Sequence, residues 1–209
     1  RQMCIRDRLN AVIDFHLVTK WKTAGDSLLA AKFLARPSSQ KILILGAGTV
    51  AYSLRQAYGS LFPDAKFFIW NRTPRHAEKL ANGFVNTQAV SDLENAVSSA
   101  DIISAATMST EPLINGKWIK PGQHIDLIGA YRSDMREADD NTLQKSRIFV
   151  DSFETTIDHI GELKIPVAQG VINKEDVIAD FYDLKGFSRN SEDEITLFKN
   201  GGGAHLDLM

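Results

Sequence analysis

Short apolar runs alternate with helical stretches along most of this chain. Runs with the length and composition of strands occur at 41–45, 67–70, 101–105, 124–128, 148–150 and 195–198. The run Lys41–Leu45 is apolar after its first residue, as expected of a parallel strand that is buried on both faces. The alternation predicts an α/β fold, a doubly wound parallel sheet with helices on both faces.

Helices are expected between these strands. The pattern predicts them over 27–35, 50–58, 75–81, 139–145 and 174–184. Pro37 ends the first of them, since the residue before a proline avoids the helical region. Ser91 and Glu94 have the spacing of a capping box, in which both side chains satisfy backbone donors at a helix start.

The turn after the first strand carries the most specific motif. It reads Gly46-Ala-Gly-Thr-Val-Ala51, which matches the G-x-G-x-x-G/A fingerprint of a Rossmann domain between a strand and a helix. Gly46 permits the tight turn, and Gly48 lets the backbone approach a pyrophosphate closely. The amides of Thr49 and Val50 lie at a helix N-terminus, where anions are favoured. The motif predicts a bound nicotinamide dinucleotide.

The end of the second strand distinguishes NADP(H) from NAD(H). An NAD site usually has Asp or Glu there, to accept hydrogen bonds from the ribose hydroxyls. This chain has Trp70-Asn71-Arg72-Thr73 instead. Arg72 can pair with a 2′-phosphate through charge-assisted bonds that contribute about 1.5–3 kcal/mol each, and Asn71 and Thr73 can donate neutral hydrogen bonds. An exposed loop arginine is the alternative reading of Arg72. The sequence therefore favours NADP(H), with NAD(H) as the alternative.

Composition narrows the class of partner. The 209 residues carry a formal net charge of -2, which gives no electrostatic case for nucleic acid or an anionic membrane. No apolar run approaches the roughly 20 residues of a membrane helix. Cys4 is the only cysteine, so an internal disulfide is excluded and a cytoplasmic location is expected. The five histidines have no ligand spacing, and no metal is predicted.

Segments around the nucleotide motif resemble the ornithine cyclodeaminase/mu-crystallin family from about Leu9 to Met209. The stretches that carry the resemblance, besides the glycine turn, are Thr19–Arg36, Trp70–Thr73, Ala105–Thr107, Gly129–Glu137 and Thr196–Ala204. The resemblance implies a fragment, because the family's chains begin with a further substrate and dimerisation portion and continue past Met209. It implies a remnant of that domain over 1–36, a Rossmann domain over 37–200, and the start of a returning helix over 201–209. Residues 1–8 are polar without a clear period, and they are interpreted as foreign to the fold or disordered. A homodimer of the full-length protein is also implied.

The resemblance also implies roles for individual residues. Lys22 occupies the position of an arginine that clamps the substrate carboxylate, although a surface lysine is the alternative. Tyr131 stands where ornithine cyclodeaminases have a catalytic Asp, and its phenol could donate a proton, orient a water or only pack. Thr107, Met108 and Ser109 would wall the nicotinamide ribose. Gly202 and its neighbours would close over the nicotinamide, with His205 following in what reads as a helix.

These features favour the reductase branch of the family. The predicted reaction is reduction of a small cyclic imino acid, Δ1-pyrroline-2-carboxylate or Δ1-piperideine-2-carboxylate, to L-proline or L-pipecolate. Three alternatives remain: ornithine cyclodeamination, an amino-acid dehydrogenase of the alanine type, and a non-enzymatic protein that binds NADPH and a small ligand. Tyr131 and the Asn71-Arg72 pair disfavour the first of these.

Overall fold

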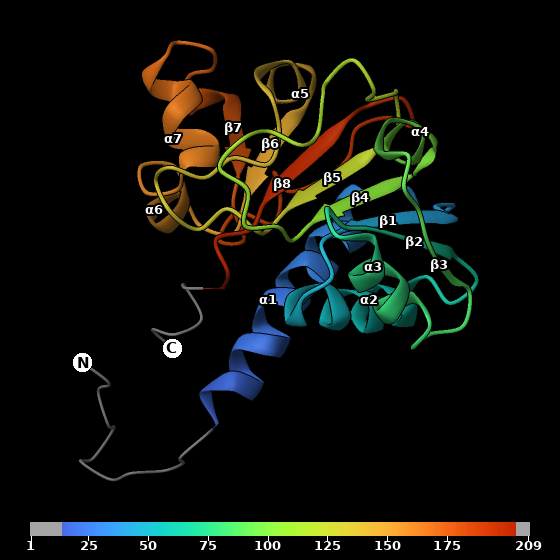
Figure 1. The fold of residues 1–209 in the computed structure, drawn as a ribbon. Coiled ribbons are helices and arrows are strands. Elements are labelled where there is room, and N and C mark those ends of the chain that lie inside the picture. The colour runs from blue at the N-terminus through green and yellow to red at the C-terminus, as the bar shows by residue number, and fades with distance from the viewer. Residues whose placement is uncertain (1–13, 204–209) are drawn as a thin grey trace, which may run out of the picture.

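The computed structural model describes residues 14–203, and its centre is one parallel sheet (Figure 1). The strand order is β3-β2-β1-β4-β5-β8-β6-β7, and every neighbouring pair is parallel. The strands are β1 (Lys41–Leu45), β2 (Lys66–Trp70), β3 (Thr87–Ala89), β4 (Ile102–Ala105), β5 (His124–Leu127), β6 (Arg147–Val150), β7 (Val177–Ala179) and β8 (Thr196–Lys199). The prediction of a doubly wound α/β fold is confirmed, and the order reverses between β1 and β4, where such folds bind ligands.

Helices cover both faces of the sheet (Figure 1). They are α1 (Phe15–Leu34), α2 (Thr49–Leu61), α3 (Pro74–Ala81), α4 (Leu93–Ser99), α5 (Asp140–Lys145), α6 (Phe153–Thr156), α7 (Gly161–Ala168) and the 3-10 helix η2 (Lys174–Asp176). The buried side chains of α1, α2 and α3 pack against one face, and those of α4, α5 and α7 pack against the other.

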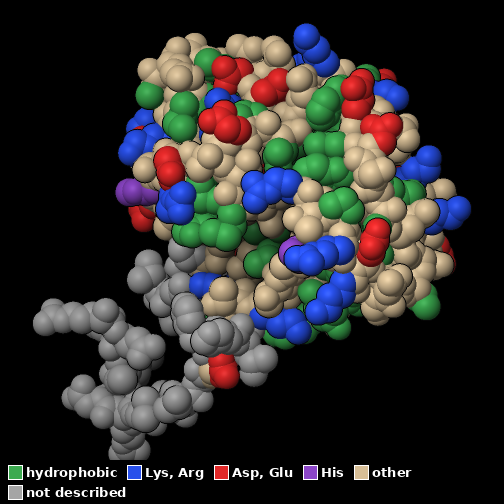
Figure 2. Space-filling model, viewed as in Figure 1, with side chains coloured by type: hydrophobic (Ala, Val, Ile, Leu, Met, Phe, Trp, Pro, Cys, Tyr) green, Lys and Arg blue, Asp and Glu red, His purple; other side chains and the backbone are tan. Residues whose placement is uncertain are grey.

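Acidic and basic side chains are interspersed over the face shown in Figure 2. Within residues 14–203 no helix combines the length and the apolar character needed to cross a bilayer. The same residues contain no group of three or more His, Cys, Asp or Glu side chains arranged to hold a metal ion.

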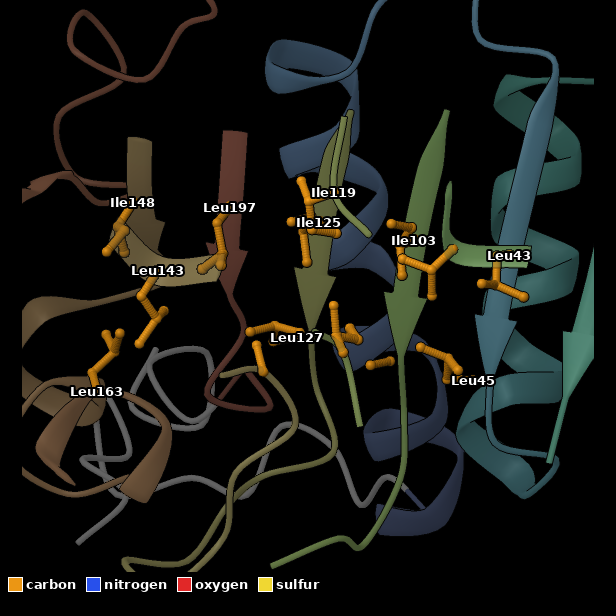
Figure 3. Close-up of a cluster of buried hydrophobic side chains, with 14 of the residues drawn as sticks. Leu43, Leu45, Ile103, Ile119, Ile125, Leu127, Leu143, Ile148, Leu163 and Leu197 are labelled. Carbon is orange, nitrogen blue, oxygen red and sulfur yellow. The ribbon is translucent and has the colours of Figure 1, made fainter. Parts of the chain in front are cut away.

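The core is divided by the sheet, and β1 contributes to both halves. Ile42 and Ile44 belong to the cluster under α1, α2 and α3, while Leu43 and Leu45 belong to the cluster on the other face. Figure 3 shows this second cluster, in which side chains of β1, β4, β5 and β8 form a continuous layer. Both sets are fully buried, which explains why the sequence of β1 is apolar without alternation.

Helix α1 is longer than predicted and packs on the sheet. Ala24 and Ala31 are buried in the cluster with α2, and a 2.6 Å ion pair joins Arg36, just past the helix, to Asp101 before β4. The division of the chain at residue 36 stays a prediction. The segment 204–209, with His205, lies outside the described residues.

The helix predicted over 174–184 is wrong. The Asn173 amide donates to the Asp176 carboxylate at 2.7 Å, and this capping box closes a single 3-10 turn. Val177 and Ala179 are then buried while Ile178 is exposed, so the segment alternates as β7 and pairs with β6. Two adjacent β-branched residues after a closed turn favour a strand over a helix.

The capping box predicted at Ser91 and Glu94 is also wrong. Asp92 caps α4, because its carboxylate accepts the Asn95 amide at 3.0 Å. The sequence contained a second capping residue one position later, and the structure uses that one. Short elements that the pattern did not predict are β3, α6 and α7.

Candidate active site

The glycine turn connects β1 to α2 at the point where the strand order reverses. Gly46 has φ +108, and its amide donates to the Trp70 carbonyl at 2.8 Å. A Cβ at Gly46 would lie 2.6 Å from the Ala106 carbonyl oxygen, so only glycine fits this position. Gly48 has ordinary backbone angles, and a Cβ added at this position would have no other atom within 4 Å. The turn is therefore tightly packed at Gly46 and open to solvent at Gly48.

A pocket of about 280 Å³ lies between the ends of β1, β2 and β4. Its lining includes Gly46, Ala47, Gly48, Trp70, Asn71, Arg72, Ala106, Thr107, Met108, Ser109 and Leu113. The structure thus brings together seven of the residues predicted to contact a cofactor. Thr49 and Val50 form the adjoining first turn of α2, and Thr73 caps α3 with its backbone.

The loop after β2 is shaped by Asn71, whose side-chain amide donates to the Thr73 carbonyl at 3.0 Å. Arg72 is exposed on this loop and lines the pocket. No carboxylate follows β2 before Pro74. An exposed arginine on a loop that carries no carboxylate suits an anionic group at this rim.

A second, more open hollow of about 560 Å³ lies on the other side of the glycine turn. Lys20 from α1 and His76 and Lys79 from α3 line it together with Thr49. Figure 2 shows Lys and Arg side chains gathered beside a histidine over this part of the molecule. The surroundings of the glycine turn are therefore basic, as an anion-binding region requires.

Lys22 and Gly202 lie near each other, where α1 meets the segment after β8. The Asn200 side chain donates to the Thr23 carbonyl at 3.0 Å and accepts the Gly202 amide at 2.7 Å. The Lys22 side chain lies 3.3 Å from the Cβ position of Gly203. Asn200 thus ties α1, which carries Lys22, to the glycine segment after β8.

Tyr131 follows β5 and is 57% exposed. The Arg132 guanidinium lies 5.8 Å from its ring centre and pairs with Asp134 at 2.9 Å. Neither Lys22 nor Tyr131 lines the pocket or the hollow beside the glycine turn. Their predicted roles therefore stay predictions.

A buried charged network that sequence reasoning missed lies at the carboxyl ends of the central strands. Lys199 is fully buried, and its ammonium donates to the carbonyls of Leu127 and Asn200, both at 2.8 Å. Burial lowers the pKa of Lys199, and four buried carboxylates oppose that shift: Glu137, Glu162, Asp151 and Asp126. The Lys199 ammonium thus partly offsets the charge of the acids beneath the loops that follow β4, β5 and β8.

Asp126 links this network to α1 and α2. Its carboxylate accepts hydrogen bonds from Ser104 at 2.7 Å, Tyr58 at 2.9 Å and Ser27 at 3.1 Å. Burial raises the pKa of Asp126 to about 6, although these three hydroxyls favour the ionised form. The signal in the sequence was a charged residue within or directly after an apolar run, as in His124–Ile128 and Ile148–Asp151.

Comparison with known proteins agrees with this geometry. A Δ1-pyrroline-2-carboxylate reductase of Paracoccus denitrificans is 53% identical over 210 residues, which cover 97% of this chain and 66% of that protein. The structure of the Thermococcus litoralis Δ1-pyrroline-2-carboxylate reductase in complex with NADH and L-proline superposes with a TM-score of 0.83 at 30% identity, covering 92% of this chain and 64% of the other. An archaeal alanine dehydrogenase dimer with bound NAD gives a TM-score of 0.82 at 28% identity, covering 92% of this chain and 63% of the other.

This chain spans roughly two thirds of the length of each of these relatives. The sequence profile of the ornithine cyclodeaminase/mu-crystallin family matches residues 8–209, nearly the whole chain. The resemblance found in the sequence motifs is confirmed, and the chain belongs to the ornithine cyclodeaminase/mu-crystallin family.

Proposed function

We propose that this chain is part of an NADP(H)-preferring oxidoreductase that reduces a cyclic ketimine, such as Δ1-pyrroline-2-carboxylate or Δ1-piperideine-2-carboxylate. The observation that carries the proposal is the pocket at the strand-order reversal, with Gly48 open on one side and Arg72 exposed on the other. The relatives with 53% and 30% identity, both named Δ1-pyrroline-2-carboxylate reductase, support the substrate class.

The pocket and the adjoining start of α2 offer the groups that would hold a dinucleotide. The amides of Thr49 and Val50 would hold its pyrophosphate at the start of α2, which has 13 residues. Arg72 would pair with a 2′-phosphate, and Thr107, Met108 and Ser109 would flank the nicotinamide ribose. The Thermococcus reductase and the archaeal dehydrogenase were solved with NADH and NAD, so the preference for NADP(H) rests on Arg72 and the missing carboxylate.

The reduction of a C=N bond asks little of the protein beyond positioning. The nicotinamide supplies the hydride when it is bound, and a protonated imine is already a good electrophile. Lys22 binds the substrate carboxylate as a point charge, and Tyr131 donates a proton to the ring nitrogen or orients a water there. Gly202 allows the segment after β8 to approach the reacting groups, since its φ is +87 and no atom lies within 4 Å of a built Cβ.

The alternative functions can be distinguished by their products. A cyclodeaminase would release ammonia from L-ornithine, and Tyr131 in place of the family's Asp argues against that reaction. An alanine-type dehydrogenase would oxidise L-alanine, and the similarity to the archaeal alanine dehydrogenase supports testing this alternative. A non-enzymatic binding protein would bind NADPH and turn over none of these substrates.

The cofactor preference is tested by titrating the chain with NADPH and NADH while following tryptophan fluorescence. Trp70 lines the pocket and serves as the reporter. We expect NADPH to bind at least about tenfold more tightly, because one charge-assisted pair contributes more than 1.4 kcal/mol. Arg72→Ala is expected to abolish this preference while leaving NADH binding unchanged.

Lys66→Ala is the matched control, since this exposed cation lies at the opposite end of the same strand. It should leave both affinities unchanged. Equal or tighter binding of NADH by the unsubstituted chain would overturn the 2′-phosphate assignment. Oxidation of L-alanine without imine reduction would replace the ketimine substrate by an amino acid.

Gly48→Ala is expected to separate cofactor binding from folding. Alanine adopts the backbone angles of Gly48, φ -88 and ψ -168, without strain, and its methyl group meets no protein atom. The methyl group would instead occupy the space where the pyrophosphate approaches the backbone. NADPH affinity should fall at least about tenfold, while the midpoint of urea unfolding stays unchanged. Unchanged NADPH affinity would mean that the pyrophosphate binds elsewhere.

Three predictions from the sequence belong to the same proposal. The full-length protein forms a homodimer, in line with the archaeal dehydrogenase dimer. Residues 1–36 and 201–209 belong to a second domain. The location is cytoplasmic, consistent with a single cysteine.

A further inference from the structure

Glu137 joins two loops that follow neighbouring strands. Its Oε1 accepts the Thr107 amide at 2.7 Å and the Thr107 hydroxyl at 2.6 Å. Its Oε2 accepts the amides of Gly129 at 2.7 Å and Ala130 at 3.3 Å. Thr107 follows β4 and lines the cofactor pocket, whereas Gly129 and Ala130 follow β5 and precede Tyr131. A single fully buried side chain therefore sets the spacing between the two loops.

The Glu137 backbone is itself held from two sides. Glu162, in the first turn of α7, accepts the amides of Glu137 at 2.7 Å and Ala138 at 3.1 Å. The Glu137 carbonyl accepts the amides of Leu113 and Ile114, both at 2.9 Å. Because both the backbone amide and the carbonyl of Glu137 are hydrogen-bonded, the position of its carboxylate is well defined.

We propose that Glu137 is a positioning residue of the cofactor pocket, whose ionised carboxylate holds the Thr107 and Gly129 loops in the arrangement that binds the dinucleotide. The inference rests on the proposed function and extends it to a residue that touches neither cofactor nor substrate. Two donors occupy each oxygen of the carboxylate. A proton on Oε2 takes the place of one of its two amide donors. A proton on Oε1 does the same or turns the Thr107 hydroxyl into an acceptor, and in either case the bonds to the loops lose the assistance of the negative charge. Protonation of Glu137 therefore weakens cofactor binding.

The groups around Glu137 bring its pKa into a pH range in which binding can be measured. Burial and then the neighbouring Glu162 raise the pKa of Glu137 to about 7, while Lys199 and the Thr107 bonds oppose the rise. Arg136 precedes Glu137 in the chain. Asp126 on β5 and Asp151 after β6 interact electrostatically with Lys199, as Glu137 does. As the pH falls through about 7, the carboxylate takes up a proton and the loops lose a common acceptor.

The test measures the Kd for NAD⁺ by tryptophan fluorescence at about pH 6 and about pH 8. NAD⁺ is the probe because it lacks the 2′-phosphate, which would itself titrate near pH 6. If only the ionised form binds, a pKa of about 7 makes binding about tenfold weaker at the lower pH. Glu137→Gln should bind NAD⁺ weakly at both pH values, because an amide cannot accept all four donors. The difference in Kd between the two pH values, called the pH step below, should therefore vanish.

Glu94→Gln, an exposed glutamate on α4, is the matched control and should keep the step of the unsubstituted chain. His76→Gln should also keep it, which excludes the histidine beside the glycine turn as the titrating group. Thr107→Val removes one bond that favours the ionised form and should shift the step to higher pH. This variant and the unsubstituted chain decide the matter if Glu137→Gln does not fold.

Equal Kd values at both pH values in the unsubstituted chain would overturn the inference, as would a Glu137→Gln variant that keeps the step. A chain that binds neither NAD⁺ nor NADPH at any pH would overturn the proposed function, and the inference with it. Binding without a pH step would leave the proposed function intact and remove only the role of Glu137.

Discussion

Lys199→Met is expected to destabilise the protein by about 3–5 kcal/mol at about pH 8, the usual cost of leaving buried charge uncompensated. The Lys199 ammonium is fully buried and interacts favourably with four buried carboxylates, Glu137, Glu162, Asp151 and Asp126. Methionine has a similar volume, so the packing is kept and the loss is electrostatic. The free energy of unfolding, from urea denaturation, measures it.

The cost should shrink as the pH falls. The pKa values of Glu137 and Asp126 are raised to about 7 and about 6. Ionisation of these buried carboxyl groups therefore destabilises the folded state, so their contribution to stability is present at low pH and is lost as the pH rises through these values. Without the ammonium their pKa values rise further, and the loss on ionisation grows. At about pH 5 the substitution should therefore cost less than roughly half of its value at pH 8.

Lys164→Met on α7 is the control, since this lysine is exposed, and it should change stability by less than about 0.5 kcal/mol. A cost for Lys199→Met that is the same at both pH values would show that packing, and not charge, explains the effect.

Gly129→Ala is expected to cost at least about 3 kcal/mol and to abolish cofactor binding. A Cβ at Gly129 would overlap the backbone oxygen and nitrogen of Thr107 and approach the Glu137 carboxylate. Backbone cannot yield as a flexible side chain can, so the loops after β4 and β5 must separate. Urea denaturation and an NADPH titration measure the two effects.

Gly25→Ala is the contrasting substitution, because Gly25 lies within α1 with nothing within 4 Å of a built Cβ. Alanine is the better helix former, and this variant should be more stable by about 0.5–1 kcal/mol. If Gly129→Ala were as stable as the unsubstituted chain, the close approach of the two loops would not be a requirement of the fold.

The fold was predictable where periodicity is strong. Lys41–Leu45 is apolar at every buried position, and the glycine turn behind it leaves a single reading of strand, turn and helix. The segment 174–184 was read wrongly because its apolar residues suit either period, and a capping bond between Asn173 and Asp176 decides against the helix. Strand β3 has three residues and gives too short a pattern to detect.

Most residues that line the pocket beside the glycine turn were predictable, because they belong to that turn and to short segments at the ends of β2 and β4. The network around Lys199 was not, because its members come from β5, β8, α7 and two loops that only the fold brings together. Glu137 stood in a segment that carried the family resemblance, yet nothing in its sequence neighbourhood indicates that it bonds to Thr107, 30 residues away.

The place of β8 in the sheet has a consequence for synthesis of the protein. Among residues 14–203 it is the last strand, but it lies between β5 and β6, which are not neighbours in the sheet. As the polypeptide leaves the ribosome, the sheet must remain in two pieces until residues 196–199 emerge and insert between them. Lys199 arrives with that strand, so the four buried carboxylates acquire their cation in the same late event that closes the sheet.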